Sequence, residues 1–318
     1  MDANFQFTVN QTQQGLTLLE CLPLCIPYLQ PNQCRSLLVS GGIKINSGVV
    51  FDDQLLKLED VVSYTVPNYE EAPVDTRWRL LWENDEIAAV HKPANLPVSR
   101  TTRNVYNTLI QLLRRESSWP DAHLLHRLDL ETSGVILIAK DNTQAKRFQP
   151  TLSSLMIRKI YHAIVHGEPS WQNLHHQSYL NTRKDSAIRC QMHPVKEGEG
   201  KLSETLFNVI SSHNGYSIVE CELLTGRKHQ IRAHLSQLGH PIVGDKIYSQ
   251  GGEFYLKRLD DALTQEDLHA WPTDHHMLHA YTVHLNNIWH QGGEPIVIRD
   301  TDYSKQWLAF CMMHGLSA

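Results

Sequence analysis

The stretch that most constrains the fold runs from His126 to Ala139 and reads HRLDLETSGVILIA. Its last five residues are apolar, and a short apolar run after Ser-Gly predicts a buried β-strand that is entered through a turn. Arg127 and Asp129 lie just before this strand, where rigid structure can hold both side chains. A nearby guanidinium favours the ionised carboxylate, so we expect Asp129 to be charged at neutral pH. A charged carboxylate suits a nucleophile or a base, but an ordinary salt bridge at a loop–strand junction explains the same pattern.

Further blocks of sequence surround this motif in a fixed order. They are VHKPANLPV at 90–98, RKIYHAIVHG at 158–167, GRKHQIRAHL at 226–235, LGHPIVGD at 238–245 and LHA at 278–280. Together with HRLDLETSG they resemble the signature of the RNA pseudouridine synthases, in the branch whose large-subunit ribosomal RNA and transfer RNA enzymes share the HRLD and TSG motifs. The resemblance covers roughly residues 79–298.

The resemblance implies the pseudouridine synthase fold, which is α+β with a mixed, mainly antiparallel central sheet. The sequence patterns agree, because helices scattered among strands without strict alternation indicate an α+β domain. Val105, Leu109 and Leu112 predict one apolar face of a helix over Asn104–Arg115, and Asp141 is placed to cap the next helix. Strand-like runs recur at 157–165, 204–211, 216–224, 277–285 and 294–298.

The chain divides into a small module at 1–66, a linker at 67–78 and a catalytic domain at 79–318. The module shows a helical pattern around Leu16–Leu22 and a tight turn at Asn46–Gly48. It resembles the small α/β RNA-binding module first seen in a small-subunit ribosomal protein. Its only basic residues besides histidine are Arg35, Lys44 and Lys57, so we expect weak RNA affinity, and a degenerate docking module is the alternative.

The resemblance implies isomerisation of uridine to pseudouridine within RNA. The base leaves the sugar, turns and reattaches through a ring carbon. Breaking a glycosidic bond builds positive charge on the sugar, so a carboxylate is the expected catalyst, and Asp129 is the candidate. It could attack the anomeric carbon, add to the uracil ring or remove a sugar proton, and the sequence does not choose among these. We expect no cofactor, because no electrons move and the sequence has no Gly-rich phosphate loop.

Two more residues complete the expected catalytic set. Tyr161 lies in a predicted strand, where its ring can stack on a uracil and its hydroxyl can take part in proton transfer, although a core tyrosine explains the same position. The resemblance makes Arg232 the partner of Asp129. In a helix over 228–238, Arg232 falls at the edge of the apolar face, where it can reach a partly buried carboxylate, and an exposed helix arginine is the alternative.

The expected RNA-binding residues come from the same motifs. Arg127 has the length and the planar fork to fill the gap left by a flipped nucleotide or to hold a phosphate. His126 and Thr132 more readily shape the loop than take part in chemistry. The full RNA-binding set is Arg127, Lys92, His126, Thr132, Arg227, Lys228 and His229.

The charge balance restricts how RNA can be held. Lys and Arg number 29 against 34 for Asp and Glu, which gives a net charge of −5. Because phosphate contacts supply much of the affinity for RNA, the basic surface must be local. Its candidates in the catalytic region are Arg127, Lys140, Lys146, Arg147, Arg158, Lys159, Arg183, Lys184, Arg189, Arg227, Lys228 and Arg232.

The hydrophobic content of 41% and the charged content of 20% are those of a soluble globular protein, and we expect a cytoplasmic monomer. That its partner is RNA is what the resemblance implies. We expect no signal peptide and no membrane span, and six cysteines without a CxxC pair fit a reducing compartment. The spacing of His275, His276 and His279 could bind a metal, but no matching carboxylate or cysteine set accompanies them, so no metal is expected. Two other functions remain open. One is an RNA-binding or RNA-folding protein that keeps the fold without catalysis, and the other is a glycosidase-like hydrolase, which lacks a recognisable second carboxylate.

Overall fold

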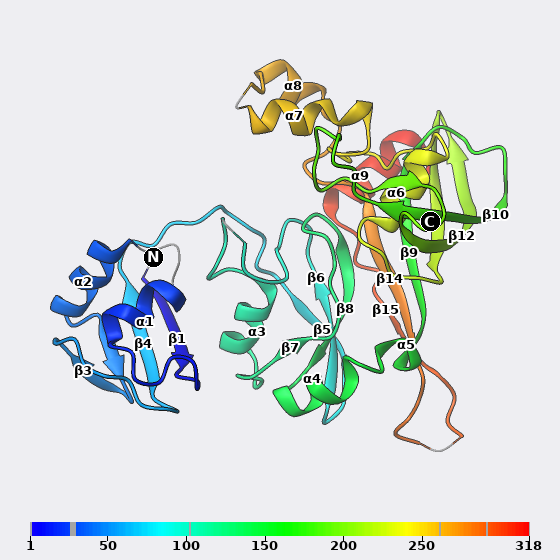
Figure 1. Cartoon of the computed structure of the whole chain (residues 1–318). Helices are drawn as coiled ribbons and strands as arrows, with labels where there is room; N and C mark the ends of the chain where they lie inside the picture. The colour runs from blue at the N-terminus through cyan, green and yellow to red at the C-terminus, as the bar shows by residue number, and fades with distance from the viewer. Residues whose placement is uncertain (1, 26–29, 102, 261, 291, 318) are drawn as a thin grey trace. The chain divides into compact units, whose positions relative to one another are not determined.

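The computed structural model describes residues 2–25, 30–101, 103–260, 262–290 and 292–317. The chain forms two compact units, which are drawn in Figure 1. The first unit comprises Met1–Pro73 with Arg100–Tyr106, and the second comprises Val74–Ser99 with Asn107–Ala318. Arg100–Tyr106 joins the first unit because Glu71 accepts hydrogen bonds from the backbone N–H groups of Val105 and Tyr106, at 3.0 and 3.1 Å.

The first unit is a small sheet with two helices. Its strand order is β1-β4-β2-β3, and every neighbouring pair is antiparallel. Asn46 and Ser47 connect β2 to β3 with φ of 49° and 71°, which is the left-handed backbone of a two-residue hairpin and confirms the predicted turn. The elements are β1 (Ala3–Thr8), α1 (Leu18–Cys25), α2 (Pro31–Val39), β2 (Ile43–Ile45), β3 (Gly48–Val50) and β4 (Val61–Val66).

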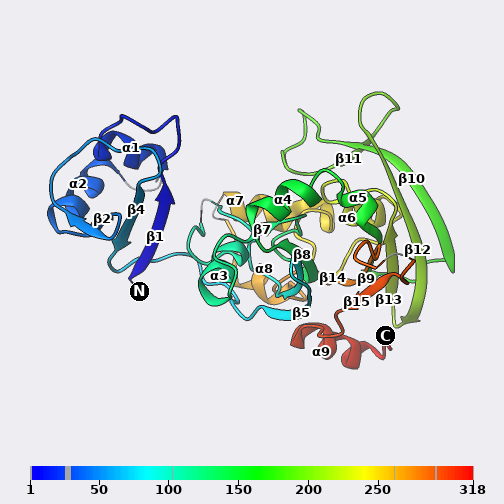
Figure 2. The ribbon, with the colours of Figure 1, turned by 90° about the horizontal axis from the view of Figure 1, so that it is seen from below.

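The second unit is built on one large sheet. Among the described residues the sheet has 11 strands, in the order β11-β10-β12-β13-β9-β14-β8-β6-β5, with β15 beside β14 and β7 beside β8. The pair β14–β8 is parallel and the other pairs are antiparallel, so the predicted mixed, mainly antiparallel sheet is confirmed. Figure 2 shows β10, β12 and β13 curving at one side of this unit. The strands are β5 (Arg79–Glu83), β6 (Ile87–Lys92), β7 (His123–Leu124), β8 (Ser133–Ala139), β9 (Met156–His166), β10 (Asn173–Asn181), β11 (His193–Val195), β12 (Lys201–His213), β13 (Tyr216–Leu223), β14 (Leu278–Leu285) and β15 (Ile296–Arg299).

The parallel pair depends on Gly134. Its φ is +108°, and a Cβ at this position would lie 2.2 Å from the Ala280 carbonyl oxygen. Only glycine therefore lets β8 approach β14 this closely. The apolar run after Ser-Gly is the fully buried strand that the sequence predicts. The motif at 278–280 lies at the start of β14, which runs in the middle of the sheet between β9 and β8.

Helices cover both ends of this sheet. In the cores, α3 packs with β6 and β8, whereas α6 and α9 pack with β9 and β13. The Asp141 side chain accepts from the Gln144 N–H at 2.8 Å, so the predicted cap is confirmed. Among the described residues, no helix is both long enough and apolar enough for a membrane crossing. The helices are α3 (Leu109–Glu116), α4 (Asn142–Phe148), α5 (Leu152–Leu155), α6 (Gln230–Gln237), the 3-10 turn η1 (Gln250–Gly252), α7 (Glu253–Leu259), α8 (Gln265–Ala270) and α9 (Lys305–His314).

Two predictions of secondary structure need correction. The helix predicted over Asn104–Arg115 begins only at Leu109, because Thr108 has an extended backbone and Val105 packs in the core of the first unit. In the second unit the predicted strands are all present, but β7, β10 and β11 were missed. In β10 only Leu180 is fully buried, and the sequence NLHHQSYLN lacks the apolar alternation that marks a half-buried strand.

Candidate active site

Asp129 lies in the loop that joins β7 to β8, where the chain enters the central sheet. A turn closes this loop, because the Thr132 backbone N–H donates to the Asp129 carbonyl oxygen at 3.2 Å. The Asp129 side chain is 28% exposed, whereas Leu128 and Thr132 in the same loop are buried. The loop is therefore anchored by buried side chains, while the Asp129 carboxylate stays partly accessible.

The Arg232 guanidinium connects this carboxylate to a second one. Arg232 lies in α6 and is 6% exposed. Its Nη1 donates to Asp129 Oδ2 at 2.7 Å, so the predicted ion pair is present and the exposed-arginine alternative is wrong. Its Nε and Nη2 donate to the two oxygens of the fully buried Asp245, at 2.7 and 2.9 Å. One arginine thus holds two carboxylates.

These charges decide the ionisation of the carboxylates. Burial by itself would raise the pKa of both carboxyl groups. The charge and hydrogen bonds of Arg232, together with smaller contributions from neighbouring groups, outweigh burial and hold the pKa of Asp129 and of Asp245 below the usual range. Asp129 is therefore ionised at neutral pH. Within the described part of the chain, no protein donor is hydrogen-bonded to its other oxygen, Oδ1.

The strand β9 carries Tyr161 between β13 and β14, where it pairs with Cys221 and Ala280. Its ring is half-buried and packs against the hydrophobic cores of both halves of the second unit. Burial raises the pKa of the phenol well above its usual value, and the Asp129 charge raises it further. Tyr161 is therefore neutral at pH 7, and part of the surface of its ring stays accessible.

Lys92 does not have the exposed position that RNA binding requires. Its side chain is fully buried at the end of β6. Its Nζ donates to the carbonyl oxygens of Pro93, Leu96 and Leu130 at 2.8, 2.9 and 3.0 Å, and burial lowers its pKa to about 7. The expected contact of Lys92 with RNA does not fit this burial. Lys92 instead ties the loop after β6 to Leu130, the residue that follows Asp129.

His126 and Thr132 also act inside the loop rather than at its surface. His126 Nε2 accepts from the Leu137 N–H at 3.0 Å, and burial lowers the pKa of the ring to about 4. The buried Thr132 hydroxyl lies 2.8 Å from His276 Nε2. Both side chains therefore shape the loop, as we expected, and their assignment to direct RNA contact does not fit these contacts.

Glu131 fixes the loop on its other side. Lys246 Nζ donates to Glu131 Oε1 at 2.8 Å, and the His276 backbone N–H donates to Oε2 at 2.9 Å. Lys246 follows Asp245 directly, and His276 lies just before β14. The segments on both sides of the α7–α8 region therefore hold the loop that carries Asp129.

The surface near this loop is basic over a small area. Arg127, Arg227 and Lys228 are exposed. Burial and then the nearby Arg227 charge lower the pKa of Lys159. The Lys159 charge in turn adds to burial in lowering the pKa of His126. Outside this area the positive charge available to bind RNA is less than the sequence suggests, because several cations are paired with acidic residues. These pairs are Lys140–Glu83, Arg147–Glu86, Arg158–Glu222 and Arg183–Asp185.

The histidines whose spacing could suit a metal have separate partners. His275 Nε2 lies 3.2 Å from the Ser304 hydroxyl, and His279 Nδ1 lies 2.8 Å from the Ser133 hydroxyl. Among the described residues, no group of three or more His, Cys, Asp or Glu side chains is placed to hold a metal ion.

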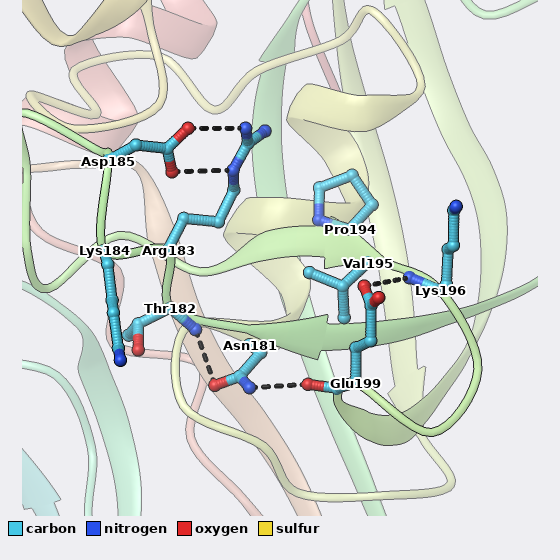
Figure 3. Close-up of a pocket in the computed structure, with 9 residues that line it drawn as sticks. All are labelled: Asn181, Thr182, Arg183, Lys184, Asp185, Pro194, Val195, Lys196 and Glu199. Carbon is cyan, nitrogen blue, oxygen red and sulfur yellow. Dashed lines mark hydrogen bonds and ion pairs between the residues drawn. The ribbon is translucent and has the colours of Figure 1, made fainter.

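A hollow of about 770 Å³ lies at the other edge of the sheet, beside β10 and β11. Figure 3 shows Arg183 and Asp185 paired with each other, and Lys184 and Lys196 pointing in opposite directions. The hollow contains none of the expected catalytic residues and none of the seven-residue RNA-binding set. Two candidates for the wider basic surface, Arg183 and Lys184, line it, but its cations do not gather at one point. It is lined by Asn181, Thr182, Arg183, Lys184, Asp185, Pro194, Val195, Lys196 and Glu199.

Known proteins align with this chain over most of its length. The family described as RNA pseudouridylate synthase matches residues 86–237. Ribosomal large subunit pseudouridine synthase D of Zymomonas mobilis is 29% identical over 280 residues, which are 83% of this chain and 87% of the relative. The enzyme of the same name from Neisseria meningitidis serogroup B is 30% identical over 267 residues, which are 79% of this chain and 70% of the relative. This chain belongs to the RNA pseudouridine synthase family.

Family membership confirms the predicted reaction class, the isomerisation of uridine in RNA, and the predicted enzyme class. The fold agrees as well. Human RNA Pseudouridylate Synthase Domain Containing 4 superposes with a TM-score of 0.58, over 76% of this chain and 94% of the human chain, at 23% sequence identity. At that identity the likeness concerns the fold alone.

The structure adds site residues that the sequence analysis did not single out. Asp245 is the second partner of Arg232, and Tyr248 lies under the same guanidinium, with its ring centre 5.1 Å away. Both follow the apolar run of the GHPIVGD motif. A buried aspartate requires a nearby cation. An aspartate directly after an apolar run was therefore the sequence signal that could have indicated the Asp245–Arg232 ion pair.

Proposed function

We propose that this pseudouridine synthase modifies a uridine in structured ribosomal or transfer RNA, and that Asp129 is its catalytic carboxylate. Large-subunit ribosomal RNA is the first candidate, because the names of both bacterial relatives refer to it. The observation that carries the proposal is the partly exposed Asp129 carboxylate, which Arg232 keeps ionised while Oδ1 has no protein donor among the described residues.

In the reaction the N1–C1′ bond of the uridine breaks and a C5–C1′ bond forms. The uracil loses its C5 proton and gains a proton at N1, so the reaction is an isomerisation without a co-reactant. A carboxylate stabilises the positive charge that develops on the sugar when the first bond breaks. Arg232 is proposed to hold Asp129 in its charged form. Tyr161 is proposed to contact the flipped base, since its half-buried ring offers a stacking face.

RNA binding is proposed to centre on the small basic surface beside the Asp129 loop. Arg127 is exposed two residues before Asp129, which suits the proposed role of filling the gap left by the flipped nucleotide. Arg227 and Lys228 are exposed just before α6 and are proposed to contact phosphates. The assignment of the first unit as an RNA-binding module, the cytoplasmic location and the monomeric state are part of this proposal.

The proposal is tested by incubating the protein with RNA tritiated at C5 of uracil and measuring the tritium released to water. We expect release from a limited set of uridines in ribosomal or transfer RNA transcripts, and none from unstructured polyuridine. Binding without release from every RNA offered would overturn the proposal in favour of a protein that binds RNA without catalysis.

A further inference from the structure

His229 lies directly after the exposed Arg227 and Lys228, but its side chain turns inward. Its backbone has φ 53° and ψ 21°, a left-handed conformation that residues other than glycine seldom adopt. Its side chain is only 9% exposed. The sequence analysis assigned His229 to RNA binding, and this burial requires a different role for the imidazole.

Tyr248 fixes the orientation of this ring. Its hydroxyl lies 3.1 Å from His229 Nδ1, and the two rings meet edge to face at 5.7 Å. The same hydroxyl accepts a hydrogen bond from the Met192 backbone N–H at 2.8 Å, and its own proton is left to donate to Nδ1 in the tautomer that we assign to His229. His229 then carries its proton on Nε2.

That Nε2–H faces the proposed catalytic carboxylate. Nε2 lies 3.8 Å from Asp129 Oδ2, the oxygen to which Arg232 Nη1 donates at 2.7 Å. The separation exceeds a hydrogen bond, and such contacts shorten when substrate closes a site. Burial, and then the Arg232 charge, lower the pKa of His229 to about 4. At neutral pH the ring is therefore an uncharged donor rather than a second cation.

We propose that His229 is a positioning residue, which together with Arg232 holds Oδ2 of Asp129 so that Oδ1 is the oxygen that meets the uridine. This inference rests on the proposed role of Asp129. A single hydrogen bond from Arg232 leaves the carboxylate free to turn about that bond. A second donor on the same oxygen fixes the plane of the carboxylate, and fixed orientation is a large part of enzymatic rate enhancement.

Four variants distinguish a positioning role of His229 from a role in packing alone. His229→Phe keeps a ring but removes the N–H, whereas His229→Gln places an amide N–H close to the position of Nε2. Tyr248→Phe removes the hydroxyl that sets the tautomer. His175→Phe is the matched control, because His175 lies in β10 with a side chain that is 52% exposed.

For tritium release we expect His229→Phe to lower kcat by about 10- to 100-fold with KM little changed, which corresponds to the loss of one hydrogen bond to a charged group. We expect His229→Gln to recover most of that loss, Tyr248→Phe to fall between the two, and His175→Phe to match the wild type. Wild-type kcat in His229→Phe would overturn the proposal. A loss that glutamine does not rescue would also overturn it, since it would mean that the ring only packs.

The pKa of Asp129, followed by NMR of its labelled carboxyl carbon, gives a readout that does not depend on turnover. The charged or titratable groups that face His229 are Asp129, Arg232, Asp245, Lys228 and Tyr248. We expect the pKa of Asp129 to rise in His229→Phe and to stay at the wild-type value in His229→Gln. An unchanged pKa in His229→Phe would overturn the inference even in an active enzyme. Wild-type protein without tritium release would instead count against the proposed function.

Discussion

Replacing Arg232 by alanine removes the only cation that contacts both Asp129 and Asp245 among the described residues. Asp245 has no exposed surface, so in the folded protein its charge depends on the guanidinium rather than on solvent. Its remaining partners are the backbone N–H groups of Ile247 and Tyr248, at 3.0 Å each, which do not neutralise its charge. Leaving a buried charge without its partner costs about 3–5 kcal/mol of folding free energy. We expect Arg232→Ala to lose that amount at pH 7.

The pH dependence of this loss has a definite sign. In the wild type the pKa of both carboxyl groups is held below the usual value near 3.8, so their contribution to stability is present above about pH 4 and is lost as the pH falls through the lowered values. In Arg232→Ala the main cause that lowers the two pKa values is gone, and burial raises both of them. The variant therefore gains stability as the pH falls from 7 towards 4, and the difference from the wild type shrinks.

Urea unfolding at pH 7.0, 5.5 and 4.0 measures this difference, and tritium release at pH 7 measures turnover. The matched control is Arg183→Ala, which breaks an exposed arginine–aspartate pair and is expected to leave the unfolding midpoint unchanged. A destabilisation of less than about 1 kcal/mol at pH 7 would refute the reasoning. So would a loss that stays the same at all three pH values, because it would show that uncompensated charge is not the cause.

Three further changes have defined outcomes. Gly134→Ala places a Cβ against the Ala280 backbone at an unfavourable φ and should destabilise the protein by about 2–4 kcal/mol in urea unfolding, and wild-type stability would show that the β8–β14 contact is not tight. The pKa of Lys92 is lowered to about 7, so the wild type should gain stability as the pH rises from 7 to 10. Lys92→Met should lack that gain in thermal melts, and equal pH profiles would contradict the assignment. Replacing Arg227 and Lys228 together by glutamine should weaken RNA binding and reduce the slope of log K against log salt by about 2, with kcat on saturating RNA unchanged. An unchanged slope would exclude phosphate contacts by these residues.

The sequence motifs predicted much of the site because they contain both members of its main ion pair. Asp129 and Arg232 lie about a hundred residues apart, and the family resemblance alone was enough to predict that they are partners. The strand after Ser-Gly was also predictable, since five consecutive apolar residues leave few alternatives to a buried strand.

The errors concern features that depend on tertiary packing. Lys92 reads as an exposed cation in the sequence, but three carbonyl oxygens from two loops surround its ammonium group, and no local pattern encodes that. Likewise, Arg158 meets Glu222 because β9 and β13 are neighbours, and the pairing of strands is not readable from charge counts. The inward turn of His229 depends on Tyr248, which lies beyond the end of α6.

The most direct test of the account compares wild-type protein and Asp129→Asn on the same C5-tritiated RNA. Asparagine keeps the size of the side chain and an oxygen for Arg232 but removes the negative charge. We predict that Asp129→Asn binds the RNA with wild-type affinity and releases no tritium above background in a single turnover. Tritium release by Asp129→Asn at a rate near that of the wild type would contradict the central claim that this carboxylate is the catalyst.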